Sequence, residues 1–229
     1  MIGVFKKCFR LALSIIFFMV MIMFIQTPVI STLSKDHVNF KQDTQGDILR
    51  VMTCIGAIIL SLYFLRLLAK CLGINLSKPH SKRRLFNDKR LLAYIVVILL
   101  ITLIYLILLF IGNGYSVGVV PKEISEMSNK PVIFTLYMFT TIISQPILEE
   151  LLFRGILQER LARYSSWISI IITSIVFSYI HGYGAIINSQ FISSIIYGII
   201  YKSSDDVRFP IIIHSLQNLV VVLFVIVFA

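Results

Sequence analysis

The sequence predicts an all-α, polytopic transmembrane helix bundle of about seven spans, with its N-terminus in the cytosol. Hydrophobic residues make up 58% of the 229-residue chain and charged residues only 14%, whereas a soluble domain has about a quarter charged residues. The apolar residues form long runs between short polar segments, as membrane-spanning helices require. No segment is both polar enough and long enough to form a separate soluble domain.

The distribution of basic residues predicts the orientation. When successive spans are given alternating directions, most of the 21 Lys and Arg residues fall on the same side as the N-terminus. An excess of Lys and Arg marks the cytosolic side of a membrane protein. The net charge of +10 therefore indicates contact with anionic lipid headgroups, and its placement argues against nucleic acid as a partner.

Residues 1–130 are expected to form N-terminal transmembrane helices, with spans near 11–30, 51–68 and 91–111. The first apolar run is too long for the hydrophobic region of a signal peptide, and no A-x-A-like cleavage site follows it, so we expect a retained helix. The third run is rich in Leu, Ile and Val and has the character of a lipid-facing scaffold.

Residues 131–229 are expected to form the C-terminal core of the bundle, with spans near 132–154, 166–182, 186–201 and 210–228. Pro131 opens a helical pattern that continues to about residue 164. Such a helix is longer than the bilayer core, so it must tilt, kink or project into the cytosol. Pro146 marks the expected kink, because proline disturbs the interior of a helix.

Two small-residue signals occur later in this region. The sequence Gly182-Tyr183-Gly184 predicts the turn between two spans. Ser194 and Gly198 form a pair of small residues at helical spacing, which permits close helix packing. This packing lies either within the bundle or between two chains.

Two adjacent carboxylates, Glu149 and Glu150, lie deep in apolar sequence, and residues 131–148 contain no charged residue. Ionised groups are costly to bury in a membrane and are therefore functional candidates. Glu150 and Arg154 are four residues apart, with the acid first, which favours an ion pair on one helix face. Glu149 points about 100° away and has no basic residue at i+3 or i+4, so we expect it to act as a general base. The alternative is an ordinary ion-pair cluster near the cytosolic surface.

Two histidines occur in apolar helical segments. His181 follows Phe177 by four residues, and His214 precedes Asn218 by four, so each pair shares a helix face. Either histidine alone is equally consistent with a hydrogen-bonded core residue. At 1.5 Å per residue, the expected depths of the two histidines, Asn218 and Glu149 straddle the middle of the bilayer. We therefore expect the three segments to converge on one buried hydrolytic site.

The motifs E-E-x-x-x-R, F-x-x-x-H and H-x-x-x-N follow one another in this order on apolar helices. This set resembles the CPBP intramembrane endopeptidases, which include the type 2 CAAX prenyl proteases and the bacteriocin-processing or immunity proteins, also called the Abi family. The resemblance covers roughly residues 131–222, with all three motifs intact. The spans up to about residue 112 contain no motif that resembles the family.

The resemblance implies hydrolysis of a peptide bond inside the membrane, by water that Glu149 and His181 activate. It implies that His214 and Asn218 stabilise the oxyanion or orient the substrate carbonyl, an interaction that usually contributes strongly to acyl transfer. The residues that it implies in supporting roles are Glu150, Arg154 and Phe177.

A metal is a separate question, because the family is often described as metalloproteases. The sequence contains no H-E-x-x-H motif, and two histidines and a glutamate would have to converge to hold zinc. We therefore assign no cofactor from the sequence alone. A divalent metal such as zinc, if bound, would be held by Glu149, His181 and His214.

We therefore expect an intramembrane endopeptidase that acts on a hydrophobic or lipidated peptide or protein, in a bacterial cell membrane. An ion- or proton-coupled transporter is an alternative, in which Glu149, His181 and His214 relay ions, although the chain lacks the repeats typical of transporters. A non-catalytic bacteriocin-immunity or scaffold protein is another. A serine hydrolase is disfavoured, because no G-x-S-x-G motif occurs. The substrate, the oligomeric state and the organism stay open.

Overall fold

The computed structural model describes residues 44–74, 76, 89–113, 130–181 and 189–228, and this part of the chain is helical, with short turns and no strand. Five of its helices are α2 (Thr44–Cys71), α3 (Lys89–Asn113), α8 (Ser166–His181), α9 (Ser189–Ser204) and α10 (Arg208–Phe228). Between α3 and α8 runs one long helix in five parts, in which η denotes a π-helix: α5 (Pro131–Phe139), η2 (Thr140–Ser144), α6 (Gln145–Leu152), η3 (Phe153–Gln158) and α7 (Glu159–Ala162).

Four helical stretches are long and apolar enough to cross a membrane: Gly46–Cys71, Arg90–Ile107, Pro131–Ala162 and Arg208–Val227. Helices α8 and α9 have 16 residues each. At 1.5 Å per residue they are about 24 Å long, which is less than the thickness of a bilayer core, about 30 Å. The all-helical membrane fold is confirmed. The count of about seven spans, the cytosolic N-terminus and the boundary at residue 130 stay predictions, and the expected span 11–30 and the turn 182–184 lie outside the described residues.

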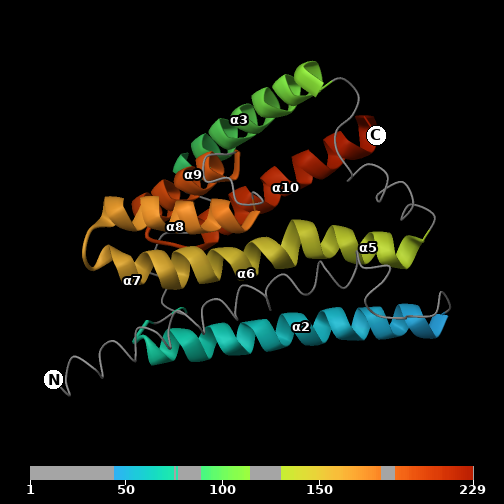
Figure 1. Cartoon of the computed structure of the whole chain (residues 1–229), viewed down its shortest axis with the longest axis horizontal. Helices are drawn as coiled ribbons and strands as arrows, with labels where there is room; N and C mark the ends of the chain where they lie inside the picture. Colours follow the sequence, from blue (N-terminus) through green and yellow to red (C-terminus); the bar gives the residue numbers. More distant parts are fainter. Residues whose placement is uncertain (1–43, 75, 77–88, 114–129, 182–188, 229) are drawn as a thin grey trace.

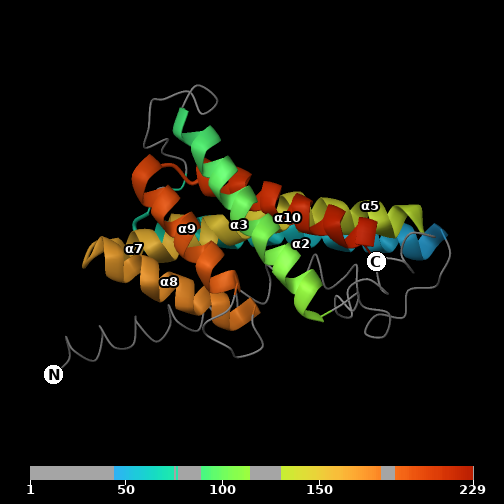
Figure 2. The same cartoon turned by 90° about the horizontal axis from the view of Figure 1, so that it is seen from above.

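The long helix from α5 to α7 lies in the middle of the molecule, with α2 along one side and α8, α9 and α10 on the other (Figure 1). Helix α3 packs on α9 and α10 and crosses them obliquely (Figure 2). The long helix therefore contacts both α2 and the C-terminal helices, and this position places its polar residues at the centre of the bundle.

Local sequence signals explain several helix ends. Gly73 has a φ of +68°, and the amides of Gly73 and Ile74 bond back to the carbonyls of Lys70 and Ala69. This is the Schellman arrangement, in which a left-handed glycine ends a helix. Pro131 begins α5, where its missing N–H costs no helical hydrogen bond.

The structure shows how the long helix accommodates Pro146, the site of the expected kink. The long helix continues through Pro146, which lies in the first turn of α6, and the irregular geometry precedes it as the π-helical turn η2. A second π-helical stretch, η3, follows α6. In a regular α-helix, the ring of Pro146 would clash with the carbonyl of Ile142, four residues earlier. The wider π-helical turn relieves this clash without breaking the helix.

Two apolar clusters stabilise the bundle, and one of them includes the long helix. Leu65 of α2, Leu152 of α6 and Phe177 of α8 belong to one buried cluster. Ile98 of α3, Tyr197 of α9 and Ile213 of α10 belong to another.

The small-residue pair of α9 packs within the chain. Ser194 and Gly198 are both buried, and their carbonyls accept hydrogen bonds from Arg154 and Gln158 of η3. A Cβ added to Gly198 would lie 3.0 Å from Gln158 Oε1 and 3.0 Å from Ile170 Cγ2. The close approach that the pair predicts therefore joins α9 to η3 and α8.

Candidate active site

Glu150 and Arg154 form a buried ion pair on the long helix. Arg154 Nε lies 3.1 Å from Glu150 Oε2, and both side chains are 0% exposed. Arg154 Nη1 also donates to Glu150 Oε1, at 3.2 Å. The ion pair expected from the four-residue spacing is therefore present, because residues i and i+4 lie one above the other on a helix.

The third guanidinium nitrogen of Arg154, Nη2, makes hydrogen bonds to α9. Arg154 Nη2 donates to Ser194 Oγ at 2.7 Å and to the Ser194 carbonyl at 2.9 Å. The rings of Phe177 and Tyr197 lie 5.1 Å and 5.4 Å from the guanidinium carbon, within the range of cation–π attraction. A guanidinium can stay charged here because a carboxylate, two acceptors and two ring faces replace its water.

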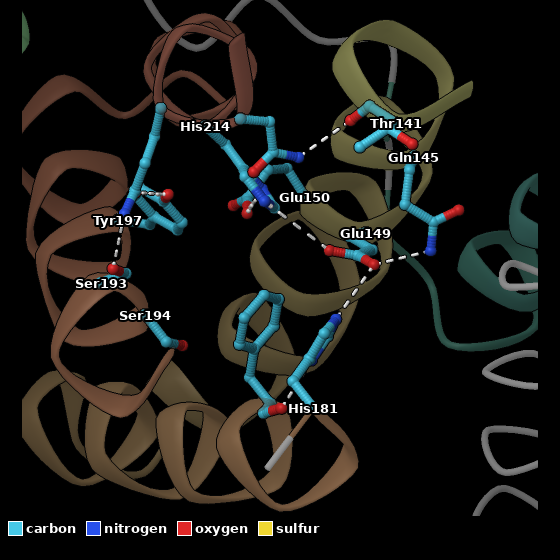
Figure 3. A network of polar contacts seen from close by, with 12 residues as sticks. Thr141, Gln145, Glu149, Glu150, His181, Ser193, Ser194, Tyr197 and His214 are labelled. Atoms are coloured by element: carbon cyan, nitrogen blue, oxygen red, sulfur yellow. Dashed lines mark hydrogen bonds and ion pairs between the residues drawn. The ribbon is translucent and has the colours of Figure 1, made fainter. Parts of the chain in front are cut away.

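Glu149 lies beside this pair and faces a different set of groups (Figure 3). Its Oε1 accepts a hydrogen bond from Gln145 Nε2 at 2.7 Å and lies 3.2 Å from His181 Nε2. Its Oε2 lies 3.9 Å from His214 Nε2, which is beyond hydrogen-bonding distance. Two donors therefore hold one oxygen of the carboxylate, and the other oxygen faces an imidazole across a gap.

Two contacts to Phe177 hold His181 in place. His181 Nδ1 lies 2.8 Å from the Phe177 carbonyl, and the two rings stack with their centroids 4.3 Å apart. A carbonyl only accepts, so Nδ1 must carry a hydrogen. The contact of Nε2 with a carboxylate oxygen then requires one more proton, shared between His181 and Glu149. The Glu149–His181 pair can therefore take up and release a proton.

Glu150 holds His214 through Nδ1, the ring nitrogen that does not face Glu149. Its Nδ1 lies 3.0 Å from Glu150 Oε1, and its ring stacks on Tyr197 with centroids 4.8 Å apart. The Nδ1–H bond to a carboxylate fixes the orientation of the ring and leaves Nε2 facing Glu149. One turn further along α10, Asn218 Nδ2 donates to the Thr141 carbonyl at 2.9 Å.

The structure brings together the residues that the motifs predict. Glu149, Glu150 and Arg154 come from the long helix, while Phe177 and His181 come from α8. His214 and Asn218 come from α10, and both make hydrogen bonds to the long helix. No finding tests the catalytic roles themselves, so these stay predictions.

Several polar residues of the site were not predicted. Gln145 precedes Glu149 by four residues, so its helical spacing was a usable signal. Tyr197 donates a hydrogen bond to Gln217 Oε1, and Gln217 Nε2 donates to Ser193 Oγ at 3.0 Å. No local pattern indicates these pairs, because they join residues 20 and 24 positions apart.

The residues give little support for a metal site. Within the described ranges, no group of three or more His, Cys, Asp or Glu side chains is arranged to hold a metal ion. His181 Nε2 lies 3.2 Å from Glu149 Oε1, as in a direct hydrogen bond. The metal set of Glu149, His181 and His214 therefore does not fit as placed, and no step of the reaction is derived through it.

The fold and the site define a class: a helical membrane protein with a buried glutamate–histidine centre. Residues 131–220 match the family model described as Type II CAAX prenyl endopeptidase Rce1-like. The match identifies an Rce1-like domain at residues 131–220, which is consistent with the CPBP family and confirms the resemblance read from the three motifs. No curated protein and no solved structure matches the chain.

Proposed function

We propose that this protein is an intramembrane endopeptidase that hydrolyses a peptide bond with water activated by Glu149 and His181. The observation that carries the proposal is the position of Glu149. Its two oxygens face His181 and His214, which come from two other helices. A carboxylate beside an imidazole in apolar surroundings is suited to move protons during hydrolysis.

The first step is the attack of water. Glu149 takes one proton from the water molecule while the water oxygen forms a bond to the carbonyl carbon of the substrate. The carbonyl π electrons move onto the substrate oxygen. His181 orients the carboxylate through Oε1, and Oε2, which faces the gap toward His214, is the oxygen that receives the proton.

The second step is the collapse of the tetrahedral intermediate. Asn218 Nδ2 and a doubly protonated His214, through Nε2, donate hydrogen bonds to the negative oxygen, as in other acyl-transfer sites. The carbon–nitrogen bond then breaks, and the proton held by Glu149 passes to the leaving amine. The products are a carboxylic acid and an amine, and Glu149 returns to its starting state.

Glu150 and Arg154 support this chemistry without touching the substrate. Glu150 holds His214 through Nδ1, and Arg154 holds Glu150. Phe177 fixes His181 through its carbonyl and its ring. These supporting contacts keep the two imidazoles aimed at Glu149, which is the requirement for rapid proton transfer.

The proposed substrate is a hydrophobic or lipidated peptide in a bacterial cell membrane, with anionic lipids at the basic loops. The family description names CAAX prenyl endopeptidases, which suggests a peptide end near a lipidated cysteine. The four apolar helices support a site that a substrate in the lipid bilayer can reach.

Cleavage of hydrophobic and prenylated peptides in proteoliposomes tests the proposal. We expect Glu149→Gln to lower kcat by about 10²- to 10⁴-fold, the usual contribution of a general base, at normal expression. Glu159→Gln is the matched control, because Glu159 lies on the same long helix and accepts a hydrogen bond from Tyr201, outside the proposed site. Cleavage that survives Glu149→Gln would show that the site lies elsewhere. Ion flux without cleavage would favour a transporter.

A further inference from the structure

The carbonyl of Thr141 lacks both of the backbone donors that a helix normally offers. In an α-helix it would accept from the N–H of Gln145, but that N–H bonds to the carbonyl of Thr140, which is the i−5 pattern of a π-helix. Its π-helical donor would be the residue five positions on. That residue is Pro146, which has no N–H.

Helix α10 supplies the replacement donor. Asn218 Nδ2 donates to the Thr141 carbonyl at 2.9 Å, and the dashed line that ends on Thr141 in Figure 3 marks this bond. A buried backbone carbonyl without a partner is costly, so such groups are nearly always paired. Asn218 therefore binds the long helix at a carbonyl that has no backbone N–H donor.

Pro146 accounts both for the π-helical turn and for the missing backbone donor of the Thr141 carbonyl. Its ring is incompatible with α-helical geometry at Ile142, four residues earlier, and the π-helical turn η2 lies in the residues directly before it. Its missing N–H then removes the remaining helical donor for Thr141. The proline thus creates an acceptor on the surface of the long helix that faces α10.

We propose that Pro146 is a positioning residue, which acts through the Thr141 carbonyl to orient the carboxamide of Asn218 toward the substrate carbonyl. This inference rests on the proposed function of Asn218 in the endopeptidase. A carboxamide nitrogen has two hydrogens. The bond to Thr141 uses one and fixes the plane of the group, and the other is left for the oxygen of the tetrahedral intermediate.

The substitution Pro146→Ala tests the proposal. Alanine lets the π-helical turn relax to an α-helix, in which the Thr141 carbonyl accepts from Gln145 and Asn218 loses its acceptor. We expect kcat for peptide cleavage to fall about 10- to 100-fold, as for other misplaced catalytic groups, with KM nearly unchanged. The control is Pro131→Ala, because Pro131 begins α5 and an added N–H there has no helical partner.

A double-mutant cycle separates positioning from general damage to the fold. In Asn218→Leu, which removes the donor, adding Pro146→Ala should lower kcat no further, because the two changes act on one contact. Equal effects of Pro146→Ala in both backgrounds would overturn the proposal. A rise in kcat in Pro146→Ala would also overturn it, since the contact would then restrain Asn218 and not orient it.

A spectroscopic measurement keeps the proposal testable if Pro146→Ala is poorly folded. In the parent protein labelled with ¹⁵N-asparagine in nanodiscs, the signals absent from Asn218→Leu identify the carboxamide of Asn218. We expect one of its two protons to be protected from solvent exchange, and expect that protection to be lost in Pro146→Ala. Two freely exchanging protons in the parent, or unchanged protection in the variant, would overturn the proposal.

The oxyanion role of Asn218 and the positioning role of Pro146 predict different outcomes. If Asn218→Leu keeps the parental kcat, the oxyanion role of Asn218 is wrong and the inference falls with it. If Asn218→Leu loses activity while Pro146→Ala changes neither kcat nor the Asn218 signals, the proposed function stands and only the positioning role of Pro146 is wrong.

Discussion

The two adjacent carboxylates, Glu149 and Glu150, lie in two regions that are built differently. The sealed region consists of Glu150, Arg154 and Ser194, which are all 0% exposed. The open region consists of Glu149, His181 and Asn218. Glu149 is 3% exposed, but the side chain of its partner His181 is 23% exposed and Asn218 is only partly buried.

The difference shows how one helix serves two purposes with neighbouring residues. A rotation of about 100° between successive residues directs Glu150 to the guanidinium of Arg154, with which it forms an ion pair. The same rotation directs Glu149 to imidazoles that can exchange protons. In the sealed region the two charges neutralise each other, and in the open region we propose that the carboxylate remains available for chemistry.

The largest expected effect is a difference in the free energy of unfolding between variants of the two regions. Glu150→Gln leaves Arg154 buried without its counter-charge, which should lower the free energy of unfolding by about 3–5 kcal/mol. Glu149→Gln keeps an acceptor for Gln145 and should cost about 1 kcal/mol. Denaturant unfolding in detergent measures both. Equal losses in the two variants would mean that the regions are not distinct.

A smaller effect tests the contacts within each region. Gln145→Leu removes the donor that holds Glu149 Oε1 and should lower kcat about tenfold, because the carboxylate loses its orientation. Gln158→Leu is the matched change near the sealed region, where Gln158 holds the Gly198 carbonyl. It should reduce stability and leave kcat within about twofold, since it touches no proposed reacting group. If Gln158→Leu lowered kcat and Gln145→Leu lowered only stability, the distinction between the sealed and open regions would be contradicted. Peptide-cleavage and unfolding assays measure the two quantities.

The smallest effect concerns the packing of α9 beside the sealed region. Gly198→Ala places a Cβ 3.0 Å from both Gln158 and Ile170, and such overpacking costs about 1–3 kcal/mol. Gly56→Ala on α2 is the control, because no atom lies within 4 Å of its added Cβ. It should be neutral or slightly stabilising, since alanine is the better helix former. Thermal unfolding that ranks the two variants the other way would exclude tight packing at Gly198.

Much of the fold follows from composition, because helices are the way to bury a backbone in lipid when no barrel pattern is present. The ion pair of Glu150 and Arg154 and the shared face of Phe177 and His181 also follow from a spacing of four residues. These contacts lie within single helices, so helical geometry alone predicts them. The span count does not follow as directly, because α8 and α9 are shorter than the apolar runs that contain them.

The rest of the site depends on how helices pack against one another. Arg154 finds Ser194 at a separation of 40 residues, and no sequence period relates the two. The Thr141 carbonyl is harder to predict, because its lack of a helical donor arises only once η2 has formed. Pro146 pointed to the right part of the chain, but its sequence signal does not distinguish a kink from a π-helical turn.

The contacts between η3 and α9 also determine how these helices can move. Arg154 and Gln158 are one turn apart, and so are the carbonyls of Ser194 and Gly198 that they bind. After a slip of one turn, Arg154 would face Gly198, which has no hydroxyl, and Gln158 would have to fit against a side chain. The two paired contacts therefore favour this register over one shifted by a turn, and we expect η3 and α9 to move together.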